Sequence, residues 1–390
     1  MVISPVGLNV KIISMKRILF GVDSLFQFII ATNLRTTVYK DDEADIIIYS
    51  STLPARGVYE KVAKTNIYRN VYYADTSLCR CGKNYSFKQK LPKYFVYLLT
   101  MSFPQNTLKR IIGSSLDDSY DEFLFNSFGA LADCIFNVCY RNNTNIVCKR
   151  IEDAYVSYFT VWGSRKSGFR RFLEKISYKV FGNKNIEDYI DGYYFSEPEM
   201  VMAKFPYPII PAPKFGRDNK AFVSLLNEIF EYNPAAKTDK ILFLFEDGRL
   251  FFDGSEEEVD LVEDMISYLP KEKMAIKMHP RRKVDRFATL GVESMKASKV
   301  PWEIIQLNQD YSGCIFMTVT SSAVFSSDIY FGDKCYKILL YKCLKTPPSS
   351  IDSKFEAYVQ KYMERFGSEY LFIPKSYEEL KEILMKLTKS

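Results

Sequence analysis

The residues best suited to chemistry gather in the stretch 240–327. His279, the only histidine of the 390-residue chain, lies near its middle and is followed by Pro280 and Arg281. Histidine exchanges a proton near neutral pH, so His279 could protonate or stabilise a departing phosphate. The run Thr320-Ser321-Ser322 offers hydroxyls and backbone N–H groups that could bind this phosphate. These residue types indicate transfer of a group from a nucleotide.

Such a transfer also needs a base, and carboxylates occur in several suitable places. Glu152-Asp153 follows a short expected strand, and Asp247 and Asp253 lie within the stretch 240–327. A solvated turn or a helix cap is the structural alternative for Glu152-Asp153. Glu303 could accept hydrogen bonds from ribose hydroxyls. The chain contains no Asp-x-Asp pair, so we expect no metal-clamped diphosphate and assign no metal ligand.

Strands that alternate with helices must position these residues. Apolar runs rich in β-branched and aromatic residues predict strands over 17–22, 44–49, 145–150, 241–245, 274–278, 314–319 and 336–340. Helical spacing and capping residues predict helices over 24–34, 121–140, 218–232, 255–269, 353–366 and from 376 onward. This alternation predicts an α/β fold with parallel sheets, which bind ligands beyond the carboxyl ends of their strands.

The length of 390 residues suggests two domains, each with its own core. Phe205–Phe215 holds four prolines and is the expected boundary between them. We therefore expect an N-terminal extension over 1–14, an acceptor-side domain over 15–215 and a nucleotide-binding domain over 216–375. Residues 376–390 are expected to form a terminal helix that packs on the body or bridges the domains.

The composition is that of a soluble globular protein, and a net charge of +6 does not by itself argue for nucleic acid. Eight cysteines without zinc-type spacing, together with no apparent secretory signal, favour the reducing cytoplasm. No apolar run is long enough for a transmembrane helix. Basic residues cluster, however, at Arg165, Lys166, Arg170, Arg171, Lys175, Lys179 and 281–283. Such clusters are either solvated or held against an anionic glycan or the anionic inner face of a membrane.

Four short motifs follow one another along the chain: E-D-A-x-x-S-Y at 152–158, H-P-R at 279–281, P-x-E at 301–303 and S-S-A at 321–323. In this order they resemble the bacterial sialyltransferases, most closely glycosyltransferase family 52. The resemblance covers residues 15 to about 330. It implies the GT-B fold, in which two Rossmann-like domains face a cleft. It also implies CMP-sialic acid as the donor substrate, inversion at the anomeric centre, and neither a cofactor nor a metal for the chemistry.

The resemblance also implies roles for individual residues. His279 would assist the CMP leaving group, Glu303 would contact the ribose, and Ser321-Ser322 would bind the phosphate. Glu152-Asp153 matches an acidic motif of related sialyltransferase families, D/E-D/E-G, whose carboxylate acts as the base. This chain departs from that motif because Ala154 stands where glycine is usual.

The sequence thus predicts an enzyme that moves sialic acid from CMP to a galactose-terminated surface glycan, either lipooligosaccharide or capsule. One alternative is another GT-B transferase using a UDP-sugar such as UDP-glucose, with Arg281-Arg282 binding the diphosphate. The other is a glycan-binding relative without catalysis. The expected partners are the nucleotide-sugar donor, the glycan acceptor and a peripheral membrane surface, with no nucleic acid. A homodimer is compatible with the sequence.

Overall fold

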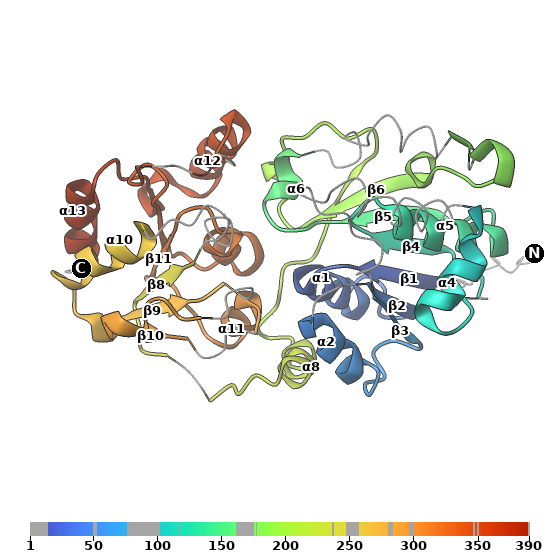
Figure 1. Cartoon of the computed structure of the whole chain (residues 1–390), viewed down its shortest axis with the longest axis horizontal. Helices are drawn as coiled ribbons and strands as arrows, with labels where there is room; N and C mark the ends of the chain where they lie inside the picture. Colours follow the sequence, from blue (N-terminus) through green and yellow to red (C-terminus); the bar gives the residue numbers. More distant parts are fainter. Residues whose placement is uncertain are drawn as a thin grey trace, which may run out of the picture.

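The computed structural model describes residues 15–49, 53–75, 102–116, 118–160, 175–176, 178–235, 238–246, 257–279, 284–295, 300–345, 348 and 351–388. Two parallel sheets lie side by side in it, each flanked by helices (Figure 1). No helix in these ranges has the length and apolar character needed to cross a bilayer.

The first sheet has seven strands in the order β3-β2-β1-β4-β5-β6-β7. The strands are β1 (Arg17–Val22), β2 (Glu43–Tyr49), β3 (Val71–Ala74), β4 (Glu122–Phe125), β5 (Val147–Ile151), β6 (Ile190–Phe195) and β7 (Ile209–Pro211). The helices around it are α1 (Leu25–Thr36), α2 (Leu53–Val62), α4 (Pro104–Ile112), α5 (Ala130–Asn142) and α6 (Val156–Phe159).

The second sheet has six strands in the order β10-β9-β8-β11-β12-β13. The strands are β8 (Leu242–Phe245), β9 (Met274–Lys277), β10 (Glu293–Ser294), β11 (Ile315–Thr318), β12 (Tyr336–Leu339) and β13 (Leu371–Phe372). Its helices are α8 (Lys220–Phe230), α10 (Glu257–Ile266), α11 (Trp302–Asn308), α12 (Ser353–Phe366) and α13 (Tyr377–Leu387).

Helices cover both faces of the sheets, which explains why the strands are continuous apolar runs. In β1, Ile18 and Phe20 pack into the core cluster that includes α1, whereas Leu19 packs into the cluster that includes α4 and α5. Gly21 lies so close to its neighbours that an added Cβ would stand 2.9 Å from the ring of Phe123. A larger residue there would require the rings of Phe123 and Tyr49 to shift.

The structure confirms the predicted α/β class and every predicted strand to within a few residues. One expected helix is wrong, because part of the range 121–140 is strand β4 and the helix begins only at Ala130. All four residues of β4 are buried, and a short strand buried on both faces cannot be told from a helix by periodicity. The proline-rich stretch 205–215 contains β7, an edge strand, where a missing N–H is tolerated.

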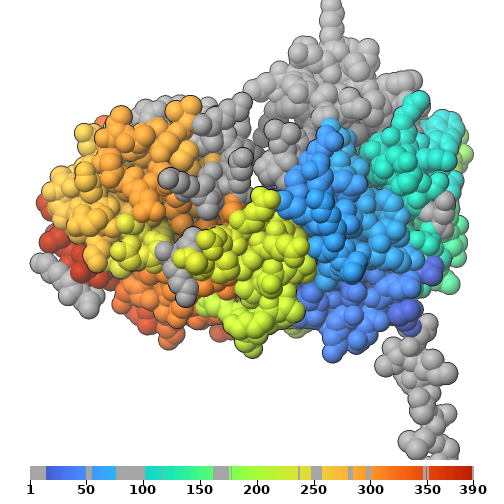
Figure 2. Space-filling view, turned by 90° about the horizontal axis from the view of Figure 1, so that it is seen from below, coloured from blue at the N-terminus to red at the C-terminus, as the bar shows by residue number. Residues whose placement is uncertain are grey.

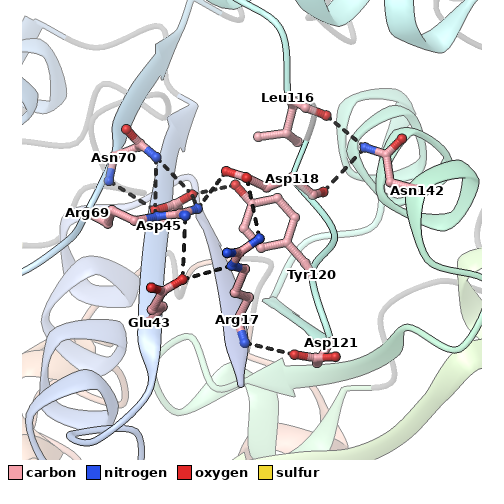
Figure 3. Close-up of polar contacts among 10 residues, drawn as sticks. All are labelled: Arg17, Glu43, Asp45, Arg69, Asn70, Leu116, Asp118, Tyr120, Asp121 and Asn142. Atoms are coloured by element: carbon pink, nitrogen blue, oxygen red, sulfur yellow. Dashed lines mark hydrogen bonds and ion pairs between the residues drawn. The ribbon is translucent and has the colours of Figure 1, made fainter. Parts of the chain in front are cut away.

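Ion pairs fasten the amino ends of the first sheet's strands (Figure 3). The buried Asp45 of β2 accepts hydrogen bonds from Arg69, Asn70 and Tyr120. Arg69 also pairs with Asp118, with 2.6 Å between Nη2 and Oδ2. Burial opposes ionisation of Asp45, but these donors lower its pKa below the ordinary value. This network is structural, and it lies at the opposite end of the strands from the residues predicted to do chemistry.

Helices and ion pairs also join the two halves of the molecule. α8 packs against α1 and α2 on one side and α11 on the other, and Figure 2 shows its yellow-green surface between the two halves. α12 packs against α6. Glu197, beyond β6, pairs with Arg365 of α12 at 2.9 Å and with Lys214 at 3.0 Å. The carboxyl edges of both sheets therefore border one interface.

Candidate functional site between the two sheets

The order of strands reverses once in each sheet, between β1 and β4 and between β8 and β11. Ligands of open parallel sheets bind at such points, outside the carboxyl ends of the strands. In the first half, Asp23 follows β1, and Glu152-Asp153 follows β5. In the second half, His279 lies just beyond β9 and Thr320 just beyond β11.

Glu152 turns into the first domain and is fully buried. Its carboxylate accepts hydrogen bonds from the backbone N–H of Ser196 at 2.9 Å, from the Ser196 hydroxyl, and from Tyr158 Oη at 2.7 Å. Burial raises the pKa of Glu152 to about 7. With both oxygens engaged inside the protein, Glu152 is placed to hold the turn after β6 and not to reach an acceptor. The geometry therefore argues against its predicted role as the base.

Asp153 has different surroundings, although it is the next residue. Its side chain is only partly buried, and the Ser24 hydroxyl at the start of α1 donates to its Oδ1 at 3.2 Å. Burial, and secondly the negative charge of Asp23, raise the pKa of Asp153 to about 6. A carboxyl group with this pKa is ionised at pH 7 and still basic enough to take a proton in a transition state. Of the adjacent pair, Asp153 is the candidate base.

Ala154 adopts the left-handed conformation, with a φ of 52°. Glycine is the residue that takes this conformation without strain. The sequence motif that Ala154 interrupts has glycine at this position, so the backbone keeps the turn although the side chain departs from the motif. This turn points the following residue, Tyr155, toward the second half of the molecule.

Tyr155 connects the two halves. Its hydroxyl donates to the backbone carbonyl of Thr320 at 3.1 Å, and its ring lies 5.5 Å from that of Phe325. A small pocket lies beside it and is lined by both halves: Phe26, Ala154 and Tyr155 from the first, and Glu303, Ser322, Phe325, Ser326, Ile329 and Tyr330 from the second. The structure thus brings the turn after β5 together with two residues predicted to bind the nucleotide, Glu303 and Ser322.

The serines after β11 differ in what they contact. The Ser321 hydroxyl accepts a hydrogen bond from the backbone N–H of Ala323 at 3.4 Å, so it caps the short 3-10 helix Ser322–Phe325. Thr320 is buried. Ser322 is partly exposed and lines the pocket. Of the three hydroxyls predicted to bind phosphate, that of Ser322 is the best placed to do so.

His279 is partly exposed just beyond the end of β9. Its backbone N–H donates to Glu246 Oε2 at 2.9 Å, and Glu246 Oε1 accepts from Arg286 Nε at 2.9 Å. Glu246 therefore holds the turn that carries His279. Pro280, Arg281, Asp247 and Asp253 lie outside the described residues, as do most members of the predicted basic cluster at 165–179.

Lys277, the last residue of β9, is a feature that the sequence analysis missed. It is buried, and burial lowers its pKa to about 8, although the charge of Glu303 partly opposes this. Burial likewise raises the pKa of Glu303, against the opposing charge of Lys277. The sequence signal was available, because a lysine interrupts the apolar strand Met274–Met278. Asp23 and Ser24 were also missed, although they follow the first predicted strand.

No protein-family model matches this chain, and neither does any curated protein. Solved structures do resemble it. The glycotransferase of kitacinnamycin superposes with a TM-score of 0.53 at 10% identity, over 96% of this chain and 91% of the other. A UDP-glucosyltransferase from Polygonum tinctorium gives a TM-score of 0.50 at 10% identity, over 96% and 92%. At such low identity the likeness shows the fold alone, which is the two-domain GT-B fold.

Proposed function

We propose that this protein is a glycosyltransferase whose donor binds on the second sheet and whose acceptor binds on the first. One observation carries the proposal. Ala154 and Tyr155, the two residues after Asp153 in the turn beyond β5, meet Glu303 and Ser322 of the second half at one pocket between the carboxyl edges of two parallel sheets. The glycosyltransferases with the same fold support this reaction class.

We further propose that the donor is CMP-sialic acid and the acceptor a galactose-terminated surface glycan. The acceptor hydroxyl oxygen forms a bond to the anomeric carbon while the bond from that carbon to the CMP phosphate oxygen breaks. Asp153 takes the hydroxyl proton, and His279 donates a hydrogen bond or a proton to the departing phosphate. Inversion requires attack opposite the leaving group. A base on the first half and phosphate ligands on the second suit that arrangement.

The number of cationic side chains that can bind the donor's phosphate groups distinguishes this proposal from its main rival, a UDP-sugar transferase. A single phosphate needs few cationic contacts, and His279 with Ser322 would suffice for CMP. Lys277 favours the rival, because a second cation near Glu303 could help to balance a diphosphate. The Polygonum tinctorium structure, a UDP-glucosyltransferase, favours it as well.

The decisive experiment offers the purified protein either CMP-sialic acid or UDP-glucose with a galactose-terminated acceptor such as lactose, with and without EDTA. We expect a sialylated product in both conditions, and tighter binding of CMP than of UDP by calorimetry. Transfer from UDP-glucose alone would support the rival. Binding of neither nucleotide would contradict the proposal in both forms and indicate a protein without catalysis.

A further inference from the structure

Apolar side chains are exposed together at one place on the first half. Phe103, directly before α4, is 52% exposed, and Val180 is 67% exposed. The rings of Phe103 and Phe181 lie 5.6 Å apart, so the two chain segments form one surface although they are far apart in the sequence. Large apolar side chains that are exposed singly are common, but a group of them on one surface indicates a partner.

Basic residues accompany these side chains. We define the aromatic-basic patch as Phe103, Val180, Phe181, Arg110, Lys175 and Lys179. Its three basic residues are exposed, and Arg110 is seven positions from Phe103, which places both on the same side of α4. Residues 102–113 and 175–184 contain no Asp or Glu. They hold five positive charges, whereas the whole chain has a net charge of only +6.

We propose that the aromatic-basic patch docks the protein on an anionic phospholipid surface. Amphipathic surfaces of this kind insert aromatic and aliphatic side chains at the head-group level, while Lys and Arg bind the anionic head groups. An anionic glycan would account for the cations. It would not account for the exposure of Val180, because an aliphatic side chain makes no favourable contact with a polyanionic chain.

The position of the patch suits this role. Figure 1 shows α4 at the end of the first sheet that lies farther from the second sheet. Docking through α4 would hold the acceptor-side half against the membrane and leave the second half in water with its soluble nucleotide donor. Membrane docking through this patch does not require the proposed glycosyl transfer.

The test is co-sedimentation of the full chain with vesicles of phosphatidylcholine, alone or mixed with phosphatidylglycerol. We expect binding only to the mixed vesicles and release by salt, since exposed charges are screened. Two double variants probe the patch: Phe103→Ser with Val180→Ser, and Lys175→Glu with Lys179→Glu. The charge reversal should weaken partitioning by at least fivefold for each lysine, because each basic residue contributes on the order of fivefold near an anionic surface.

Matched controls use equally exposed residues elsewhere. Val38 and Val284, 44% and 73% exposed, are changed to Ser, and the exposed Lys40 and Lys64 are changed to Glu. All variants should keep the wild-type melting temperature. The proposal is overturned if the wild-type protein does not bind mixed vesicles, or if the control variants lose as much binding as the patch variants. It is also overturned if a soluble anionic polysaccharide binds the protein while vesicles do not. Activity on soluble lactose is assayed separately, so failure of the proposed reaction would not be confused with failure of docking.

Discussion

At the scale of single residues, the adjacent acids Glu152 and Asp153 show how position decides role. Both have raised pKa values, about 7 and about 6, and burial is the main cause for each. Only Asp153 is partly exposed, directly before the two residues that line the pocket, Ala154 and Tyr155. Carboxyl groups with shifted pKa values often mark functional sites. Only a carboxyl group that a substrate can reach, however, can act as a base.

Asp153→Asn should lower turnover by about 10²–10⁴-fold, because the acceptor proton would have no base. CMP affinity should stay unchanged. In the wild-type protein, kcat/KM should fall as the pH drops below about 6, where Asp153 takes up a proton. Turnover, calorimetry and a pH profile check these points. Full activity of the variant would place the base elsewhere, with Asp247 and Asp253 as the remaining candidates.

Glu152→Gln should change stability and its pH dependence more than it changes catalysis. The folded-state pKa of Glu152 is about 7, whereas the ordinary pKa of a glutamate side chain is 4.5. Between these values the folded state holds a proton that the unfolded state has lost, so the free energy of unfolding decreases as the pH rises through this window. Because Gln cannot ionise, the variant should gain stability relative to wild type by about 2–3 kcal/mol between pH 5 and pH 8.

Urea unfolding of both proteins at the two pH values checks this expectation. Turnover at pH 7 should remain within about tenfold of wild type, a smaller loss than removal of a general base causes. A variant that folds normally and has lost all activity would restore Glu152 as the base. A constant stability difference at both pH values would mean that Glu152 titrates normally.

Ala154→Gly should stabilise the protein by about 1 kcal/mol, because the left-handed conformation at φ 52° strains any residue with a Cβ. Ala132→Gly is the control with the opposite sign. Ala132 lies within α5, where glycine costs about 1 kcal/mol. Thermal melting of the two variants should therefore shift in opposite directions. A loss of stability for Ala154→Gly would show that the Cβ makes favourable contacts in the pocket that outweigh the strain.

At the scale of elements, the sequence could predict strands that are long apolar runs and helices that have caps. α13 illustrates the second case, since Ser376 Oγ accepts from the backbone N–H of Glu379 as its capping sequence predicts. β4 could not be predicted, because burial on both faces removes the alternation that marks a strand. The order of the strands in each sheet could not be predicted from the sequence either, because it depends on contacts between residues that are distant along the chain.

The candidate site was partly predictable for the same reason. The rule that parallel sheets bind ligands at their carboxyl ends located Asp153, His279, Glu303 and Ser322. It could not say which of two adjacent acids is enclosed in the first half, as Glu152 is, and which stays partly exposed, because that depends on the three-dimensional course of the turn before Ala154. Nor could it find the contact of Tyr155 with Thr320, two residues that are 165 positions apart.

Asp45→Asn at the amino end of β2 should destabilise the protein by about 1–3 kcal/mol, the usual contribution of hydrogen bonds to charged groups. Because the pKa of Asp45 is lowered on folding, its contribution is present above its ordinary pKa and is lost as the pH falls through the folded-state value. Asp118→Asn is the control, since Asp118 is more exposed and exposed ion pairs contribute less than about 1 kcal/mol. Equal effects of the two changes in urea unfolding would contradict this ranking.

At the scale of the whole molecule, the two halves meet through side chains that also form the pocket. Tyr155→Phe removes the hydroxyl that donates to Thr320 but keeps the ring. We expect the free energy of unfolding to fall by about 0.5–1.5 kcal/mol. KM for the donor should rise, because the closed arrangement of the halves loses a hydrogen bond.

Tyr341→Phe provides the matched control. Its hydroxyl donates to Glu356 at 3.1 Å, entirely within the second half. This variant should lose a similar amount of stability and keep the wild-type KM. Equal KM values for both variants would show that the Tyr155 hydroxyl does not help to hold the halves together.

The order Asp153, Ala154, Tyr155 along the chain affects the state in which the donor is bound and no acceptor is present. Tyr155 contacts the second half through the carbonyl of Thr320 and the rings of Phe325 and Tyr358. Separation of the two halves would therefore displace the turn that carries Asp153. In the proposed reaction, an open molecule would hold its donor with the proton acceptor displaced. Water that enters the open cleft would then meet no group able to activate it, and the activated sugar would be spared from wasteful hydrolysis.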